Sequence, residues 1–137
     1  MVDALSEIHR VLAPRGILID ARPDSRVFAS AGRRRPHSIQ RFGIIKTQAA
    51  ELAADRAAGR AIAAVLRRNL FSVRRSGRLW HEIPFDGLAE LRDYLSEHMR
   101  FVHRATWVVD AATRRRYARE TFVIRRAVRY SVLQALP

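Results

Sequence analysis

Cysteine is absent from the 137 residues, and lysine occurs only once, at Lys46. Without cysteine the chain has no disulfide, no thiolate nucleophile and no cysteine-containing zinc site, as expected in a reducing compartment. Long apolar runs are also missing. The longest stretch without a charged residue covers the eight residues 130–137, whereas a membrane helix needs ~20 apolar residues. Asp3 and Glu7 interrupt any signal peptide, so we expect a cytoplasmic protein with no membrane partner.

Glycine is sparse and is never arranged as Gly-x-Gly. The six glycines stand alone at positions 16, 32, 43, 59, 77 and 87, so the chain has no glycine-rich loop to cradle a phosphate or a dinucleotide. The five histidines, at 9, 37, 81, 98 and 103, show no metal-like spacing with each other or with carboxylates. No Ser/His/Asp signature is present. We therefore assign no catalytic, cofactor-binding or metal-binding residue.

Positive charge is abundant and clustered. The chain has 26 basic and 13 acidic residues and a net charge of +13. The three segments 22–46, 67–78 and 114–129 together carry +17, and the rest of the chain carries −4. If these segments share one face, they attract phosphates or another polyanion. The ordinary alternative, solvated arginines scattered over the surface, stays open.

Hydrophobic periodicity predicts four helices and several strands. The predicted helices cover residues 2–13, 48–70, 86–99 and 110–119. Gly59, inside the second helix, costs about 1 kcal/mol relative to alanine, so we expect a bend or close helix packing there. Residues 101–109 and 120–133 read as strands, the second with Phe122, Ile124, Val128, Tyr130 and Val132 on one face.

The middle of the chain is predicted from its turn residues. Residues 70–73 and 79–85 flank an arginine-rich segment with Ser76 and Gly77 at its centre, which predicts a β-hairpin. Residues 25–46 contain the tract Gly32-Arg33-Arg34-Arg35-Pro36, and we expect a loop with at most one short strand. Neither an internal repeat nor a flexible linker divides residues 1–137, so we expect one domain.

The apolar run Ile17–Ile19 predicts a strand buried on both faces of a parallel sheet. Ligands of open α/β sheets bind beyond the carboxyl ends of the strands. This rule nominates Asp20, Arg22 and Asp24 as residues on the substrate side, in the loop that leaves the strand. The structural alternative is that the two aspartates cap a turn and pair with Arg22 or Arg26.

Two arginine-rich segments mix charge with aromatic rings, which is typical of surfaces that hold phosphates and stack bases. Arg74, Arg75 and Arg78 surround Trp80 in the first segment. The second contains Arg114, Arg115, Arg116, Tyr117 and Arg119. No ribonucleoprotein motif, zinc finger or convincing helix-turn-helix accompanies them. A nucleic-acid-binding or scaffold module with salt-sensitive, sequence-indifferent binding is therefore one functional hypothesis.

A second hypothesis comes from residues 4–20, Ala-Leu-Ser-Glu-Ile-His-Arg-Val-Leu-Ala-Pro-Arg-Gly-Ile-Leu-Ile-Asp. This run resembles the class I S-adenosylmethionine-dependent methyltransferases, type 11-like, at the helix that leads into the fifth strand of their Rossmann-like sheet. The match extends over residues 4–24, and Arg15 stands where glycine is commoner. The resemblance implies an α/β fold: a partial Rossmann-like sheet, with a parallel strand, antiparallel C-terminal strands and a hairpin, flanked by helices.

The resemblance also implies that the cofactor-binding half of such a domain lies outside this chain. We expect no cofactor for this chain alone, and S-adenosylmethionine only if an N-terminal half complements it. The chain is then not expected to transfer methyl groups by itself. A sheet cut in this way has an open edge, which a homo-oligomer, strand exchange or a separate N-terminal subunit would cover. A start codon further upstream would instead restore an ordinary enzyme.

Overall fold

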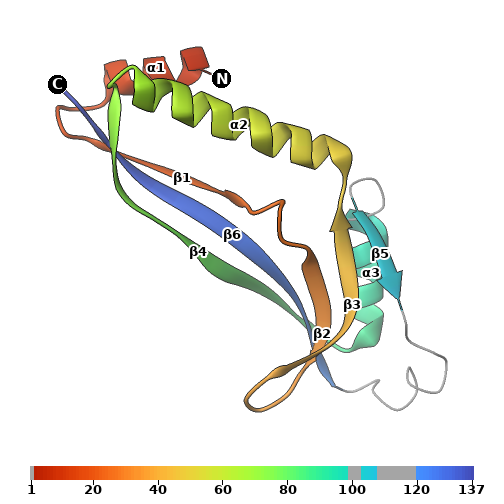
Figure 1. Cartoon of the computed structure of the whole chain (residues 1–137). Helices are drawn as coiled ribbons and strands as arrows, with labels where there is room; N and C mark the ends of the chain where they lie inside the picture. Colours follow the sequence, from red (N-terminus) through yellow and green to blue (C-terminus); the bar gives the residue numbers. More distant parts are fainter. Residues whose placement is uncertain (1, 99–102, 108–119) are drawn as a thin grey trace.

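The chain is described by a computed structural model for residues 2–98, 103–107 and 120–137. These residues form an α/β fold with a six-stranded sheet (Figure 1). The elements, in chain order, are α1 (Val2–Val11), β1 (Ile17–Pro23), β2 (Ala29–Arg34), β3 (Ile39–Thr47), α2 (Ala49–Arg67), β4 (Phe71–Asp86), α3 (Leu88–His98), β5 (His103–Trp107) and β6 (Thr121–Ala135).

Strand β6 organises the sheet. One of its edges pairs with β4 from Phe71 to Asp86, and its other edge pairs first with β2 and then with β1. Strand β3 lies beyond β2, and β5 lies beyond β3. Every pairing is antiparallel. As a result, β1 and β4 run in the same direction on opposite sides of β6.

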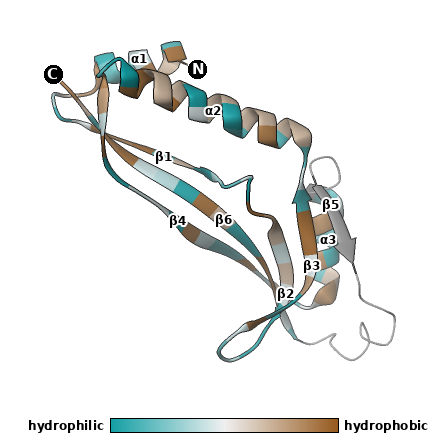
Figure 2. Cartoon of the chain, viewed as in Figure 1, coloured by the Kyte–Doolittle hydropathy of each residue, from teal (hydrophilic) through white to brown (hydrophobic). Residues whose placement is uncertain are grey.

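Two separate hydrophobic cores hold the helices against the sheet. Under α1 and α2, Leu5 and Val65 pack with Phe71 and Leu133. At the other end of β6, Leu91 of α3 packs in a cluster that includes Phe85, Phe122 and Ile124. Figure 1 shows α2 along one half of the β1–β6–β4 sheet and α3 beside the far end. Hydrophilic residues alternate with hydrophobic ones along α2 (Figure 2), so one side of this helix can be buried.

The helical predictions for the first 98 residues are confirmed, with the ends shifted by a few residues. Arg15, in the turn after α1, has a φ of 63°, which costs a non-glycine residue about 1 kcal/mol. The expected bend or close packing at Gly59 is wrong, because the nearest atom to a Cβ there would be Arg129 Nη2 at 3.8 Å. The helix predicted over 110–119 lies outside the described residues.

The prediction for β1 is wrong in its burial and in its neighbours. Within the described residues, β1 pairs only with β6 and is antiparallel to it. Burial alternates along the strand: Leu18 faces the core under α2, whereas Ile17 and Ile19 are 48% and 64% exposed. Ile17–Ile19 therefore forms an edge strand with one covered face.

The hairpin predicted over 70–85 is one continuous strand, β4, with a register shift between Val73 and Arg75. Gly77 lies within this strand opposite Tyr130, and a Cβ on Gly77 would lie 2.9 Å from the tyrosine hydroxyl oxygen. The glycine thus accommodates a neighbouring ring, and no turn forms there.

The loop predicted over 25–46 is also wrong, because two strands, β2 and β3, occupy most of it. Their connection is short: the Arg35 N–H donates to the carbonyl oxygen of Ser38 at 2.8 Å. Gly32 lies in β2 beside a register irregularity, where Ile39 and Gln40 leave no room for a side chain. Gly32 is therefore explained by the close approach of the neighbouring strand β3 and does not mark a loop.

Candidate functional site

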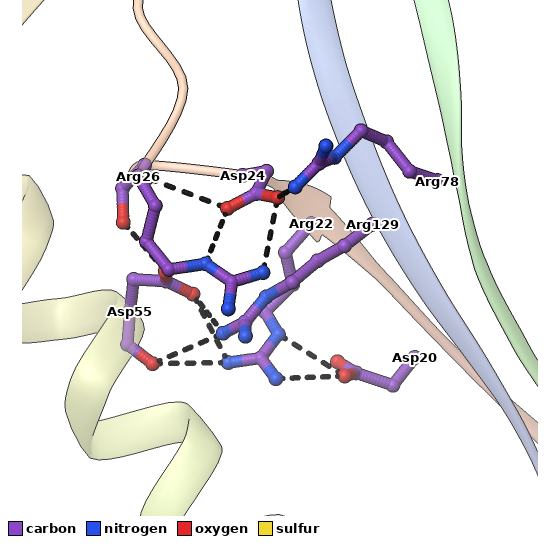
Figure 3. Close-up of polar contacts among 8 residues, drawn as sticks. Asp20, Arg22, Asp24, Arg26, Asp55, Arg78 and Arg129 are labelled. Atoms are coloured by element: carbon purple, nitrogen blue, oxygen red, sulfur yellow. Dashed lines mark hydrogen bonds and ion pairs between the residues drawn. The ribbon is translucent and has the colours of Figure 1, made fainter.

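The structure brings Asp20, Arg22 and Asp24 together in one ionic cluster beneath α2. Asp20 and Arg22 lie within β1, and Asp24 directly follows it. Three partners from other elements join them: Asp55 of α2, Arg78 of β4 and Arg129 of β6 (Figure 3). We define the ionic cluster as these six side chains together with Ser25 and Arg26. The three sequence candidates are therefore not in a free loop.

Asp24 is the most deeply buried carboxylate of the cluster. Its side chain is 0% exposed, and it accepts hydrogen bonds from Arg26 Nε at 2.8 Å and Arg78 Nη2 at 2.7 Å. The hydrogen bond from Arg26 holds the pKa of Asp24 well below its usual range; burial opposes this shift, and Arg78 adds to it. Asp24 is thus a permanent anion at neutral pH.

Asp55 joins α2 to the sheet. Its carboxylate accepts hydrogen bonds from Ser25 Oγ at 2.5 Å, from Arg22 Nη1 at 3.4 Å and from Arg129. Burial raises the pKa of Asp55, but the hydrogen bonds from Ser25 and Arg129 outweigh it and leave a net lowering. A second contact of the same kind, between Arg126 of β6 and Glu51 of α2, lies one helical turn away.

The predicted pairing of Asp20 with Arg22, and of Asp24 with Arg26, is confirmed. Arg22 Nη2 lies 2.9 Å from Asp20 Oδ2. The structural alternative for these residues therefore describes most of what they do, which is to neutralise one another in a partly buried layer. Four arginines and three aspartates leave the cluster with a net charge of +1.

The sequence alone did not single out Asp55 or Arg129, although a signal for Asp55 was present. Glu51 and Asp55 are one helical turn apart and share a stripe with Ala58, Ile62 and Val65. Val65 at the end of this stripe is fully buried, so acids in the same stripe face the sheet and need basic partners. No comparable signal marks Arg129 among the many arginines of the chain.

Two pockets border the ionic cluster. The first, of about 380 Å³, is lined by Arg26, Ser76, Arg78, Arg129 and Ser131 together with Asp24, Gly77 and Tyr130. The second, of about 310 Å³, lies between α2 and the end of β1 and includes Ala54, Asp55 and Ala58. The first pocket places three guanidinium groups beside two serine hydroxyl groups.

The arginines and the tryptophan of β4 do not form one surface. The strand register places Arg78 and Trp80 on the face that carries Arg129, whereas Arg75 lies on the opposite face. Trp80 is 44% exposed, and the guanidinium of Arg125 lies 4.3 Å from its ring centroid. Arg74 donates a hydrogen bond to Gln134. The other candidates, Arg114, Arg115, Arg116 and Arg119, lie outside the described residues.

The described residues offer no fit to S-adenosylmethionine. The polar side chains at the end of β1 are engaged in ion pairs. Gly16, before β1, lies against Leu12 and Ala13, and Gly77, in β4, lies against the ring of Tyr130. No group of three or more metal-ligating side chains occurs in the part of the chain that the structure describes. None of its helices there is both long enough and apolar enough to span a bilayer.

Three comparisons bear on the family of the chain. Searches against protein-family models, curated proteins and solved structures gave no match. The resemblance of residues 4–24 to a methyltransferase therefore stays a prediction.

Proposed function

We propose that this chain is a methyltransferase-like subunit that does not transfer methyl groups alone and that acts after a second polypeptide covers the edge of β1. One observation carries the proposal: β1 is an edge strand whose Ile17 and Ile19 side chains are largely exposed. An unpaired edge with apolar side chains is a template for another strand.

The open face of the sheet supports the same proposal. The open face is the side of β1, β6 and β4 that faces away from α2. It carries Ile17, Ile19, Leu79, Val128 and Val132, with Ile19 opposite Val132 and Leu79 opposite Val128. Leu79 is 47% exposed. Sheets of the Rossmann type carry helices on both faces. Along this half of β6, the described helices cover only one.

The last strand also supports the proposal, although every pairing among the described strands is antiparallel and the expected parallel strand is not found there. A methyltransferase-like C-terminal portion is expected to finish with a long antiparallel strand. β6 is such a strand, and it lies between two strands, β1 and β4, that share one direction.

The test combines light scattering with isothermal titration of S-adenosylmethionine. We expect either a homodimer or a monomer that binds no cofactor, and Ile19→Lys should dissociate a homodimer. The matched control is Phe28→Lys, which places the same charge at another exposed apolar residue. Tight cofactor binding by a monomer would overturn the proposal. So would a homodimer that Ile19→Lys leaves intact.

A second candidate function, binding of nucleic acid or another polyanion, is favoured by the exposed middle of β4. Residues 73–81 are all exposed and contain three arginines, Trp80 and no acid, with Arg75 on the opposite face of the strand from Arg78 and Trp80. We expect affinity for a single-stranded oligonucleotide to fall steeply with salt, and to fall further in Arg74→Gln with Arg75→Gln. Affinity that does not change with salt would exclude this function.

A further inference from the structure

We infer that the pocket lined by Arg26, Arg78 and Arg129 binds the phosphate group of a small phosphorylated molecule. This site is separate from the edge of β1, and the inference does not depend on the methyltransferase-like function proposed above. It rests on the donors that converge on the pocket, on their unused hydrogen-bonding capacity and on the size of the space.

The donors come from three parts of the fold. Arg78 and Arg129 are directly opposite each other on β4 and β6, and Ser76 and Ser131 form the next pair on the same face. Arg26, from the segment after β1, completes the lining. The pocket thus presents three guanidinium groups and two serine hydroxyl groups, with Tyr130 also in its lining and Asp24 as its one carboxylate.

The arginines are held in place with donors to spare. A guanidinium group has five N–H donors, and Asp24 accepts two hydrogen bonds from Arg26 and two from Arg78. The Nε atom of Arg129 is buried and has no hydrogen-bond partner among the described residues. A buried donor without a partner is uncommon in a native protein and calls for an acceptor.

Asp24 gives this site its rigidity. Because its carboxylate is fully buried between Arg26 and Arg78, it fixes both guanidinium groups before a ligand arrives. Such preorganisation reduces the side-chain entropy that binding costs. With Asp24 counted, the lining carries a charge of +2, and Asp55, which is bonded to Arg129 from outside the lining, reduces it to +1, which still attracts a phosphate monoester.

The number of donors favours phosphate over a carboxylate. One arginine satisfies a carboxylate through two parallel hydrogen bonds, whereas a phosphate group presents three or more acceptor oxygens to several donors. A volume of about 380 Å³ lies within the range of small-molecule sites and leaves room for more than the phosphate itself. The recessed position of Arg129, with a side chain 25% exposed, favours a small molecule over a nucleic-acid backbone.

The experiment is isothermal titration of the full chain with sodium pyrophosphate at constant ionic strength, with sodium succinate as the carboxylate comparison. We expect one pyrophosphate per chain and weaker binding of succinate. Arg78→Gln and Arg129→Gln should each weaken pyrophosphate binding about tenfold. The matched control Arg92→Gln, which removes the same charge from the exposed side of α3, should stay within about twofold.

Several results would overturn the inference. One is the absence of saturable binding in the millimolar range, and another is succinate binding as tight as pyrophosphate binding. The third is an equal loss in Arg92→Gln, which would leave only non-specific attraction by net charge. If Arg129→Gln fails to fold, pyrophosphate binding is measured instead in the two single variants Ser76→Ala and Ser131→Ala, because these variants keep every ion pair. Unchanged affinity in both serine variants and in Arg78→Gln would also reject the site.

An oligonucleotide titration separates the two sources of phosphate. A small-molecule site predicts that Arg129→Gln weakens pyrophosphate binding and leaves binding of a single-stranded oligonucleotide unchanged. An Arg129→Gln variant that loses oligonucleotide binding but keeps pyrophosphate binding would contradict the assignment to a small molecule.

Discussion

Asp24 and Arg78, 54 residues apart in the chain, are joined by two hydrogen bonds to the same carboxylate oxygen, at 3.0 and 2.7 Å. Through this contact the segment after β1 is fastened across β6 to β4, although β1 and β4 are not neighbours in the sheet. The buried carboxylate also holds Arg26. Removing it should therefore affect stability in a pH-dependent way.

Asp24→Asn is expected to lower the free energy of unfolding by roughly 2 to 3 kcal/mol at pH 7, because two guanidinium groups lose their counter-ion. The pKa of Asp24 is lowered in the folded state, so its stabilisation is present above the unfolded pKa of about 3.9 and is lost as the pH falls through the folded value. Urea unfolding at pH 7 and in strong acid should show the difference from wild type shrinking on acidification.

The control for this prediction is Glu7→Gln, which removes the exposed ion pair with Arg10 and should change stability little. A pH-independent loss in Asp24→Asn would show that the aspartate acts through shape and hydrogen bonding rather than through its charge.

Asp55 and Arg129 should be energetically coupled. Their side chains are 10% and 25% exposed and meet between α2 and β6. A double-mutant cycle with Asp55→Asn and Arg129→Gln is expected to give a coupling of about 1 to 3 kcal/mol in urea unfolding. The more exposed pair Arg34–Glu82 should give less than about 1 kcal/mol. Equal coupling in the two pairs would argue against α2 being held by this contact.

Two glycine substitutions should act in opposite directions. A Cβ on Gly32 would lie 2.5 Å from Ile39 Cγ2 and 2.9 Å from the Gln40 carbonyl oxygen, so Gly32→Ala should destabilise by about 1 to 3 kcal/mol. Gly59 lies inside α2, where a Cβ would make only an ordinary contact with Arg129 Nη2 at 3.8 Å, and Gly59→Ala should stabilise by up to about 1 kcal/mol. Thermal unfolding by circular dichroism measures both, and a destabilised Gly59→Ala would indicate that α2 packs closely at this point after all.

Leu133→Ala and Leu79→Ala test the two faces of the sheet. Leu133 is 0% exposed in the core under α1 and α2, so its truncation should cost about 3 kcal/mol. Leu79 lies on the open face and should cost the monomer less than about 1 kcal/mol. Urea unfolding at low protein concentration gives both values. A large cost at Leu79 that grows with protein concentration would instead reveal a covered face.

The helices were predictable from the sequence because each has its own apolar stripe, as in Leu88, Leu91 and Leu95 of α3. The strands were harder because their neighbours decide their structure. Ser76 and Gly77 resemble a hairpin tip, yet the Tyr130 ring across the ladder requires glycine in a straight strand. Ile17–Ile19 has the composition of a central strand but lies at an edge.

The ionic cluster was predictable only in its local part. Asp20 with Arg22, and Asp24 with Arg26, are two residues apart, so their pairing follows from short-range geometry. The contacts from Arg22 to Asp55, from Arg78 to Asp24 and from Arg129 to Asp55 bring together residues 33 to 74 positions apart. They depend on the register of β1, β4 and β6, which the amino-acid pattern alone did not specify.

Among the described residues, β4 pairs with β6 and with no strand on its outer edge, which has a consequence for how the protein avoids self-aggregation. A long exposed strand is where fibril-like stacking of identical chains begins, and like charges on such a strand oppose it. Arg74, Arg75 and Arg78 lie in the exposed middle of β4 with no acid among residues 73–81. Two copies brought edge to edge there would repel each other, which protects the protein at the concentrations reached during its synthesis.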